Sequence, residues 1–462
     1  MAEAIPAPAE WAQQQFSQVA LGDVRRTRRA VKLATQMAAQ PQLSWPKQAG
    51  TWAATKAGYR LFGKQDVTFE ALQTEHWAQT RAAAATRAVV LHIQDGSQVD
   101  YSGPRARDGL GPIGDGGGWG FLLHTTLTVD PQTTAVLGLA QQTLTVRQPA
   151  PPQETKRQRK QRPRESQVWG QSVAALGVAP ANSCWVQVCD READMFAFFA
   201  ACQQHGHHFL VRAAQNRRAA LGHAATEAAG GLLDMARTLP AGAQKELELR
   251  RRPQRAPRRV RLDVAWAAVT LWPPQDERVG ATPLRLWVVR VWEPQTPAGE
   301  EPIEWVLLTD VPTADAAAAL ARAEWYALRW LIEEYHKCLK SGCGVEARQL
   351  ETAERLAACI ALLAVVAVRL LQLKHTARHA PQRPAVECVS LDHVRVLAAY
   401  RSRPAETFTA YEFWREVAKL GGFLARRRDG EPGWQTLWRG WRDLDLMTCG
   451  ARLAREGAPR CG

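Results

Sequence analysis

Two strand-like runs, far apart in the chain, each lead into an aspartate. Residues 88–93 (AVVLHI) are followed closely by Asp95, and residues 184–189 (CWVQVC) directly by Asp190. Loops at the carboxyl ends of strands hold side chains beside a rigid scaffold, which is where ligands and catalytic groups gather in α/β sheets. One such aspartate often only caps the following turn. Together, the two predict an α/β sheet with an acidic site at the ends of its strands.

A third acidic residue lies on a helix predicted over about 316–340, within a stripe of polar side chains. At about 100° per residue, one narrow arc of this helix holds Tyr326, Arg329, Glu333, Lys337 and Lys340. Glu334 lies about 100° further round, outside the stripe. Salt bridges four residues apart on a solvated face would explain the alternating charges. They would not explain why Tyr326 joins them.

Three carboxylates from two strands and one helix suit hard divalent cations, which prefer oxygen ligands. We therefore predict that Asp95, Asp190 and Glu333 bind two Mg²⁺ ions, for which Mn²⁺ can substitute. Two such ions about 4 Å apart can activate a water or a 3′-hydroxyl and stabilise the leaving oxygen of a phosphodiester. The neighbouring Arg and Lys side chains would hold phosphates, Arg through two parallel hydrogen bonds and Lys as a point charge.

The charge balance favours a polyanionic partner. The chain has 59 Lys and Arg against 45 Asp and Glu, a formal net charge of +14, which biases binding toward nucleic acid. A basic helix capped by Asp23 and a second helix over 53–62 predict a helical, DNA-binding start, although a solvated charged face would look the same. The basic stretch 156–164 fits a phosphate-contacting loop and a solubilising loop equally well.

Membrane, secreted and zinc-binding classes are not favoured. The first residues lack the basic start and apolar run of a signal peptide. The longest apolar run, 356–368, is too short to span a bilayer and predicts a buried core helix. The nine cysteines show no C-x-x-C spacing, so neither a disulfide framework nor a zinc site is indicated. We expect a cytoplasmic protein with no membrane partner.

The remaining patterns fill in an α/β architecture. Strand-like runs at 121–129 and 134–139 follow a Gly-rich loop and predict a meander with the strand before Asp95. A helix is expected over 165–177. Residues 210–310 are strand-like and irregular, and the Trp-rich last part of the chain is predicted to be helical.

The acidic residues and the polar stripe resemble the signatures of a known family. Asp95 in IQDGSQVDY, Asp190 in VCDREADMF and the spacing Tyr326-(2)-Arg329-(3)-Glu333-(6)-Lys340 resemble the DDE and YREK motifs of bacterial cut-and-paste transposases of the insertion-sequence-four family, and within it the transposon-five group. The resemblance covers most of the chain. It includes ALGDVRRTRR, AGYRLF, LLAVVAVRLLQL and LGGFLARRRDG.

The resemblance implies a fold and a domain order. A helical N-terminal domain that binds the DNA ends is expected over 1–75. An RNase H-like catalytic domain is expected over 76–375, with a β-rich insertion at about 215–312. A helical C-terminal dimerisation region is expected over 376–462. The partners implied are double-stranded DNA, both element ends and target, and a second copy of the chain in the synaptic complex. Such a protein would be bacterial and would lie with the nucleoid when bound to DNA.

The resemblance also assigns DNA contacts by position. End-DNA contacts would be made by Arg25, Arg26, Arg29 and Arg60. Contacts beside the active site would be made by Arg212, Lys337 and the YREK residues Tyr326, Arg329 and Lys340. Trp305, in IEWVLLTD, matches the family's tryptophan that stacks on a base flipped out beside the cleavage site, which offsets part of the unpairing cost. Without the resemblance, Trp305 would be assigned to the core of a buried strand.

Three stretches depart from the family pattern. Ala39 and Gln40 replace residues that contact DNA in the family, which predicts a different end sequence. The loop 109–118 is unusually rich in glycine, and the arginine cluster 250–261 has no counterpart. None of these departures touches the DDE and YREK residues.

The function implied is a transposase that nicks the inverted repeats of its own element with water. The resulting 3′-hydroxyl forms a hairpin on the opposite strand, which reopens before the ends join target DNA. Two alternatives stay open: an RNase H-like nuclease without strand transfer, and a catalytically inactive or domesticated protein that only binds DNA ends. A glycosidase would also use two acids, but would not need the Tyr–Arg–Lys stripe.

Overall fold

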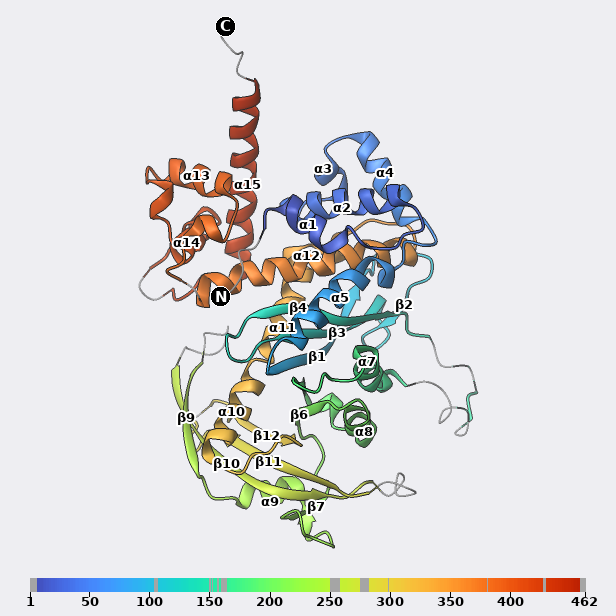
Figure 1. The fold of residues 1–462 in the computed structure, drawn as a ribbon, viewed down its shortest axis with the longest axis vertical. Helices are drawn as coiled ribbons and strands as arrows, with labels where there is room; N and C mark the ends of the chain where they lie inside the picture. The colour runs from blue at the N-terminus through green and yellow to red at the C-terminus, as the bar shows by residue number, and fades with distance from the viewer. Residues whose placement is uncertain are drawn as a thin grey trace.

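The computed structural model places helices at both ends of the chain around one large sheet (Figure 1). The basic stretch 156–164, except residues 158 and 164, and residues 250–257 of the arginine cluster lie outside the described residues. The structure describes residues 6–103, 107–148, 151, 153–155, 158, 164–249, 258–274, 282–297, 299–379, 381–426 and 429–457.

The predicted helical start of the chain is present. It comprises α1 (Pro8–Phe16), α2 (Val24–Ala39), α3 (Trp45–Ala49), α4 (Trp52–Phe62) and α5 (Phe69–Ala85). Asp23 caps α2 as predicted, because its carboxylate accepts the backbone N–H of Arg25 at 2.8 Å. Leu33 and Met37 on α2 are fully buried, so the apolar face of this basic helix packs inward and leaves most of its arginines at the surface.

The meander before the second aspartate is also present. Its strands are β1 (Val89–Asp100), β2 (Gly111–Ile113), β3 (Gly118–Val129) and β4 (Val136–Thr145), and β3 pairs antiparallel with both β1 and β4. The expectation that Asp95 ends its strand is wrong. The β2–β3 hairpin lets β3 continue alongside β1, so β1 runs on to Asp100 and Asp95 pairs with Thr125 in mid-strand.

The same sheet continues through β5 (Cys184–Cys189) and β6 (His208–Arg212) into the strands predicted between 210 and 310. β5 lies parallel to β1, and β6 lies parallel to β5. β12 (Glu304–Thr309) then pairs antiparallel with β6. The outer strands are β7 (Arg218–Leu221), β8 (Gly230–Gly231), β9 (Ala243–Leu249), β10 (Arg258–Leu271) and β11 (Leu284–Trp292). Within the described residues the sheet has 12 strands, with β2-β3-β1-β5-β6-β12-β11-β10-β7-β8 as its main path.

Three short helices accompany this half of the sheet: α7 (Val168–Leu176), α8 (Phe196–Gln204) and α9 (Leu232–Thr238). Trp169 on α7, Phe199 on α8 and Phe209 on β6 are buried in one apolar cluster. The rings of Phe199 and Phe209 stack at 4.5 Å. This cluster fixes the strand that leads to Asp190 against its neighbour β6.

The predicted long helix over 316–340 is wrong as a single element. It consists of α10 (Ala316–Ala327), α11 (Trp330–Lys337) and a π-helical turn (Cys338–Gly342). At the break, Arg329 N donates to Tyr326 O and Leu331 N to Leu328 O, so bonds three residues apart replace those four apart. No Pro or Gly marks the break. It instead accompanies the contacts of Arg329 described below.

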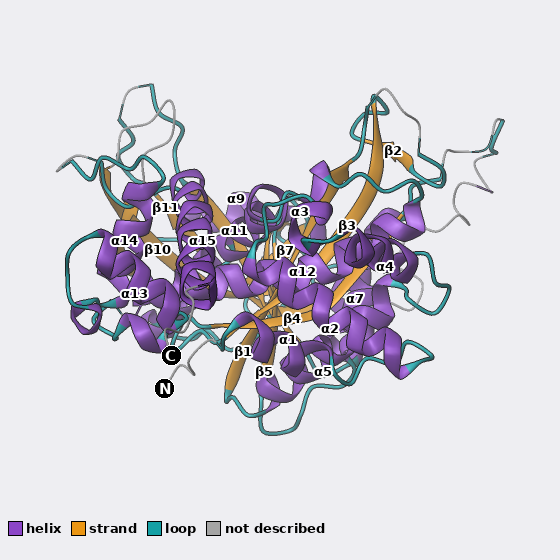
Figure 2. Cartoon of the chain, turned by 90° about the horizontal axis from the view of Figure 1, so that it is seen from above, coloured by secondary structure: helices purple, strands orange, loops and turns teal. Residues whose placement is uncertain are grey.

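A long apolar helix joins the two helical regions. α12 (Ala353–His379) is long and apolar enough to cross a membrane by composition, but 89% of that stretch is buried inside the protein, as expected of a core helix. It contacts α2, α4 and α5 on one side and α14 (Ala410–Leu420) toward its end. Figures 1 and 2 show the C-terminal helices near one end of α12 and the N-terminal helices α1 to α4 along the rest of it. The C-terminal helices are α14 together with α13 (Leu391–Tyr400) and α15 (Trp434–Gly457).

Candidate active site

The three predicted carboxylates come from adjoining elements. Asp190 follows β5 directly, and its Oδ1 accepts the backbone N–H of Glu192 at 2.9 Å, which starts a short 3₁₀ turn. Asp95 lies on the neighbouring parallel strand β1. Glu333 lies on α11, which packs against β1. The fold therefore brings together acids that are widely separated in the sequence.

Arg329 lies between two of these acids. Its Nη1 is 3.7 Å from Asp95 Oδ2, and its Nη2 donates to Glu333 Oε1. The side chains of Arg329 and Asp95 are each 20% exposed. The break between α10 and α11 thus places a cation among the carboxylates instead of on an outer helix face.

The pKa of Asp95 reflects the nearness of the other two acids. The pKa of Asp95 is raised to about 7, chiefly by burial and in smaller part by the carboxylates of Asp190 and Glu333, while Arg329 opposes the rise. Burial and two neighbouring acids thus disfavour the ionised form of Asp95. A bound cation would favour that ionised form and lower the pKa.

The donor set fits a hard divalent cation, since all three groups are carboxylates beside one another. Within the described residues, no three His, Cys, Asp or Glu side chains are grouped closely enough to hold a metal ion as they stand. The guanidinium of Arg329 contacts carboxylate oxygens of Asp95 and Glu333 that a bound cation would need.

An aromatic and cationic group lies next to Asp190. Tyr326 on α10 is buried, and its ring meets that of Trp305 on β12 edge to face at 5.3 Å. Arg212, the last residue of β6, donates to the backbone carbonyl of Glu304 at 2.7 Å and lies near Tyr326. Trp305 is half-buried against the core, so the two assignments considered for it, core residue and base platform, are both compatible with its position.

The two lysines of the stripe separate. Lys337 is exposed on α11. Lys340 lies on the π-helical turn with its Nζ 3.5 Å from Glu346 Oε1, and Glu346 also accepts the backbone N–H of Asp100 at 3.2 Å. The wider turn changes the angular spacing, so the single arc predicted for a regular helix does not extend to Lys340.

The N-terminal arginines lie on a different part of the molecule, among helices on the far side of α12 from the sheet (Figure 1). Arg25 is 85% exposed and pairs with its own helix cap Asp23. Arg26 donates to Leu21 O and to Asp66. Arg29 is partly exposed, and Arg60 is exposed near the end of α4.

The sequence analysis missed charged residues that are buried around this site. Asp194 in the VCDREADMF segment pairs with Arg217, and Glu334, next to Glu333, pairs with Lys374 on α12. An acid directly before the apolar run 195–202 (MFAFFAAC) was the available signal for the first pair. No local signal marks the second pair, since its partners are 40 positions apart.

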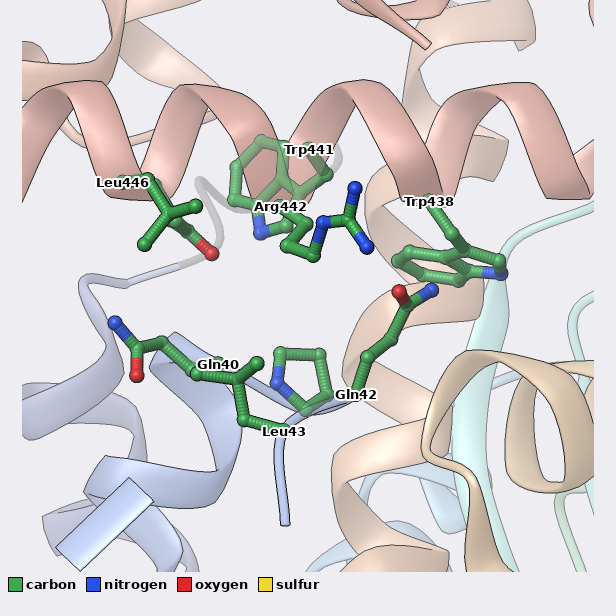
Figure 3. Close-up of a pocket in the computed structure, with 9 residues that line it drawn as sticks. Gln40, Gln42, Leu43, Trp438, Trp441, Arg442 and Leu446 are labelled. Atoms are coloured by element: carbon green, nitrogen blue, oxygen red, sulfur yellow. The ribbon is translucent and has the colours of Figure 1, made fainter. Parts of the chain in front are cut away.

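A small hollow of about 300 Å³ lies away from this site, between the loop after α2 and helix α15 (Figure 3). Its lining includes Leu43, Trp441 and Leu446. Carboxylates do not gather there; Asp445 is the single acid in the lining. The acidic site on β1, β5 and α11 is therefore the better candidate for chemistry.

Comparison with known proteins agrees with this choice. Residues 8–67 match a family described as transposase DNA-binding, 185–369 one described as transposase DDE domain, and 365–459 one described as transposase Tn5 dimerisation domain. The DDE match begins at β5 and includes Asp190 and Glu333, whereas Asp95 precedes it.

Among solved structures, the chain is similar to piggyBac transposase, seen by cryo-EM in a synaptic complex with hairpin DNA. The identity is 9% and the TM-score 0.36, over 99% of this chain and 79% of that one, which is too remote to support an argument. The three family matches together decide the matter: the chain belongs to the Tn5-like DDE transposases, enzymes that cleave and move DNA with the help of divalent metal ions.

Proposed function

We propose that Asp95, Asp190 and Glu333 are the catalytic residues of this transposase and lie in an RNase H-like domain. The observation that carries the proposal is the shared contact of Arg329 with Asp95 and Glu333, beside Asp190. It joins the acids from β1 and α11 at a partly buried position, where the side chains of Arg329 and Asp95 are each 20% exposed and that of Glu333 is 45% exposed. The order of the strands that hold the site, antiparallel β3 and β1 followed by parallel β5 and β6, is consistent with an RNase H-like core.

The same three carboxylates would hold two Mg²⁺ ions, with Mn²⁺ as a substitute. When bound, the ions would supply activation of the attacking oxygen and stabilisation of the leaving oxygen. The protein's own residues position the DNA. Arg329 offers a planar fork of donors that suits a phosphate, and Lys337 and Lys340 add positive charge along the same helical segment.

The reaction proposed at each element end has four stages. Water first cleaves one strand at the inverted repeat and leaves a 3′-hydroxyl. That hydroxyl then attacks the opposite strand and forms a hairpin, which is reopened before the 3′ ends join target DNA. Trp305 supports the hairpin stage as a platform for a flipped base, since its ring is half-buried and is held against Tyr326. Arg212 adds positive charge near Tyr326.

The assembly proposed is a homodimer that pairs two DNA ends. Arg25, Arg26, Arg29 and Arg60 would contact end DNA from the N-terminal domain over 1–75. The C-terminal region over 376–462 would bring two copies together, and the catalytic domain over 76–375 would act between them, with its insertion at about 215–312. We propose that the protein works on DNA in the cytoplasm.

A cleavage assay tests the proposal. Purified protein is incubated with labelled element ends and Mg²⁺, alongside Asp95→Ala, Asp190→Ala and Glu333→Ala. We expect each variant to bind the ends and to cleave none. Cleavage that survives any one of the three substitutions would remove that residue from the catalytic set.

The same assay separates the two alternatives. Wild-type protein that cuts the ends but never joins them to a target plasmid would be a nuclease without strand transfer. Wild-type protein that binds the ends without cutting them in Mg²⁺ or Mn²⁺ would be an inactive or domesticated DNA-end-binding protein.

A further inference from the structure

We propose that Asp194 is a positioning residue for this active site. It would connect two segments: the turn on which Asp190 lies, and the loop that follows Arg212. The inference rests on the proposed role of Asp190 as a metal ligand, and adds a residue that no motif of the DDE–YREK set includes.

The contacts of Asp194 are all internal. Its side chain is fully buried, and that of its partner Arg217 is 6% exposed. Oδ2 accepts the backbone N–H groups of Ala214 at 2.8 Å and Gln215 at 3.1 Å. Oδ1 accepts Arg217 Nε at 3.1 Å, and the same guanidinium donates to the Asp194 carbonyl oxygen.

These contacts join two segments of the site through one carboxylate. Asp194 directly follows the 3₁₀ turn that Asp190 starts. Ala214 and Gln215 come two and three residues after Arg212, the last residue of β6. Displacing the carboxylate would therefore move the turn behind Asp190 and the strand end that holds Arg212 relative to each other.

Stability alone does not explain a charged pair at this place. Burying two charges costs several kcal/mol per ion, and well-packed apolar side chains of similar volume usually serve stability equally well. A carboxylate can do what an apolar side chain cannot, which is to hold two successive backbone N–H groups at fixed positions. Outer residues of this kind orient metal ligands, and losing one typically costs about 10- to 100-fold in metal affinity or activity.

The test uses the full-length protein and Asp194→Asn. The amide keeps the shape of the carboxylate, but it offers one acceptor oxygen where three donors bind. Its N–H₂ group would face at least one of these donors. We expect the Mg²⁺ concentration for half-maximal end cleavage to rise about 10- to 100-fold. Affinity for labelled ends in Ca²⁺ should stay within about twofold, and Mn²⁺ should restore part of the rate.

Asp130→Asn is the matched control. Asp130 is also a buried carboxylate of this sheet, and it accepts the backbone N–H of Gln132 at 2.9 Å and lies 3.9 Å from Arg87. It comes five residues along from Thr125, the partner of Asp95, or about 16 Å at the rise of a strand. We expect this variant to lower the melting temperature without changing the Mg²⁺ requirement.

Hydrogen exchange gives a second measurement. In wild-type protein the amides of Ala214 and Gln215 should be protected, and in Asp194→Asn both should exchange faster. If Asp194→Asn does not fold, Arg217→Lys keeps a cation at the site and should show a smaller rise in the Mg²⁺ requirement.

The outcomes separate the proposed catalytic role of Asp190 from the proposed positioning role of Asp194. An Asp190→Asn protein that still cleaves would overturn the proposed function itself. If Asp190→Asn is inactive but Asp194→Asn has the wild-type Mg²⁺ requirement, or one shifted no more than that of Asp130→Asn, then Asp194 has only a structural role and this inference is wrong.

Discussion

Arg329 contacts Asp95 across the junction between the α10–α11 break and β1, with its Nη1 3.7 Å from the carboxylate Oδ2. Because the same guanidinium also holds Glu333, positive charge already lies between two proposed metal ligands in the DNA-free chain. A phosphate is the natural alternative partner of that guanidinium. Metal binding and DNA binding should therefore favour each other.

We expect Arg329→Ala to bind Mn²⁺ more tightly than wild-type protein when DNA is absent, because the competing cation is gone. In wild-type protein, added end DNA should raise the Mn²⁺ affinity by about 5- to 150-fold, the usual range for coupled sites. The variant should lose most of that difference. Titration followed by Mn²⁺ electron paramagnetic resonance measures both affinities, with Arg329→Lys as the charge-preserving control. Equal Mn²⁺ affinities of wild-type protein and Arg329→Ala, each with and without end DNA, would contradict the coupling.

The raised pKa of Asp95 predicts a pH-dependent metal requirement. Burial holds this pKa at about 7 in the metal-free protein, so protons compete with the metal below that pH. With limiting Mg²⁺, the rate of end cleavage should rise as the pH increases through about 7, and saturating Mg²⁺ should move the rise to lower pH. A midpoint that does not change with Mg²⁺ concentration would show that another group controls the rate.

The same shift affects stability in the opposite direction. An acid whose pKa is higher in the folded than in the unfolded state stabilises the fold while protonated. This contribution is complete below the unfolded value of 3.8 and is lost as the pH rises to about 7. Asp95→Asn should therefore be more stable than wild-type protein at pH 8 in EDTA, by at most about 4 kcal/mol. Urea unfolding at pH 5 and pH 8 checks this, because the difference should shrink at the lower pH.

Local patterns were enough to predict most elements of the fold. Asp23 was identified as a helix cap because capping depends on neighbours two or three residues away, and the buried helix around 356–368 followed from its unbroken apolar run. The end of β1 was misplaced because strand length depends on the partner strand. Ser97 and Val99 belong to β1 since β3 lies beside them.

The same reasoning explains what could be predicted of the site. Residue types and spacing identified Asp95, Asp190 and Glu333, and the structure places them on adjoining elements. The Arg329–Glu333 pair follows from their four-residue spacing, whereas the contact of Arg329 with Asp95 was not predictable, because a regular helix was assumed where the chain has a tight turn. Asp194 was overlooked since its partners come from a loop about twenty residues later.

Trp305 should matter after the first nick. Stacking on an unpaired base is worth about 1–3 kcal/mol, so Trp305→Ala should slow hairpin formation by roughly 5- to 150-fold. The first nick should change little, and Trp305→Phe should keep most of the activity. Fluorescence of 2-aminopurine placed beside the cleavage site reports the flipped base directly. A hairpin rate in Trp305→Ala equal to that of wild-type protein would leave Trp305 as a core residue.

The N-terminal arginines should separate into two kinds. Arg29→Ala should reduce the slope of log affinity against log salt by about 1, as expected for one lost phosphate contact, and should leave the melting temperature unchanged. Arg26→Ala should also lower the melting temperature, because Arg26 holds Leu21 O and Asp66 in the folded domain. Binding of end DNA across a salt series, with thermal melts of both variants, checks this. An unchanged slope in both variants would place the end-DNA contacts elsewhere.

Glu334 and Lys374 should behave as a buried ion pair that holds α11 to α12. Lys374 Nζ lies 3.0 and 3.1 Å from the two carboxylate oxygens, and the side chains are only 7% and 12% exposed. Removing one partner takes this contact from a buried charge, so Glu334→Leu or Lys374→Met alone should lower the free energy of unfolding by about 3–5 kcal/mol. The double variant Glu334→Leu/Lys374→Met should recover most of that loss, because neither charge remains. Urea unfolding of the four proteins measures the coupling between the two sites, and additive effects of the single substitutions would show that the contact contributes nothing specific.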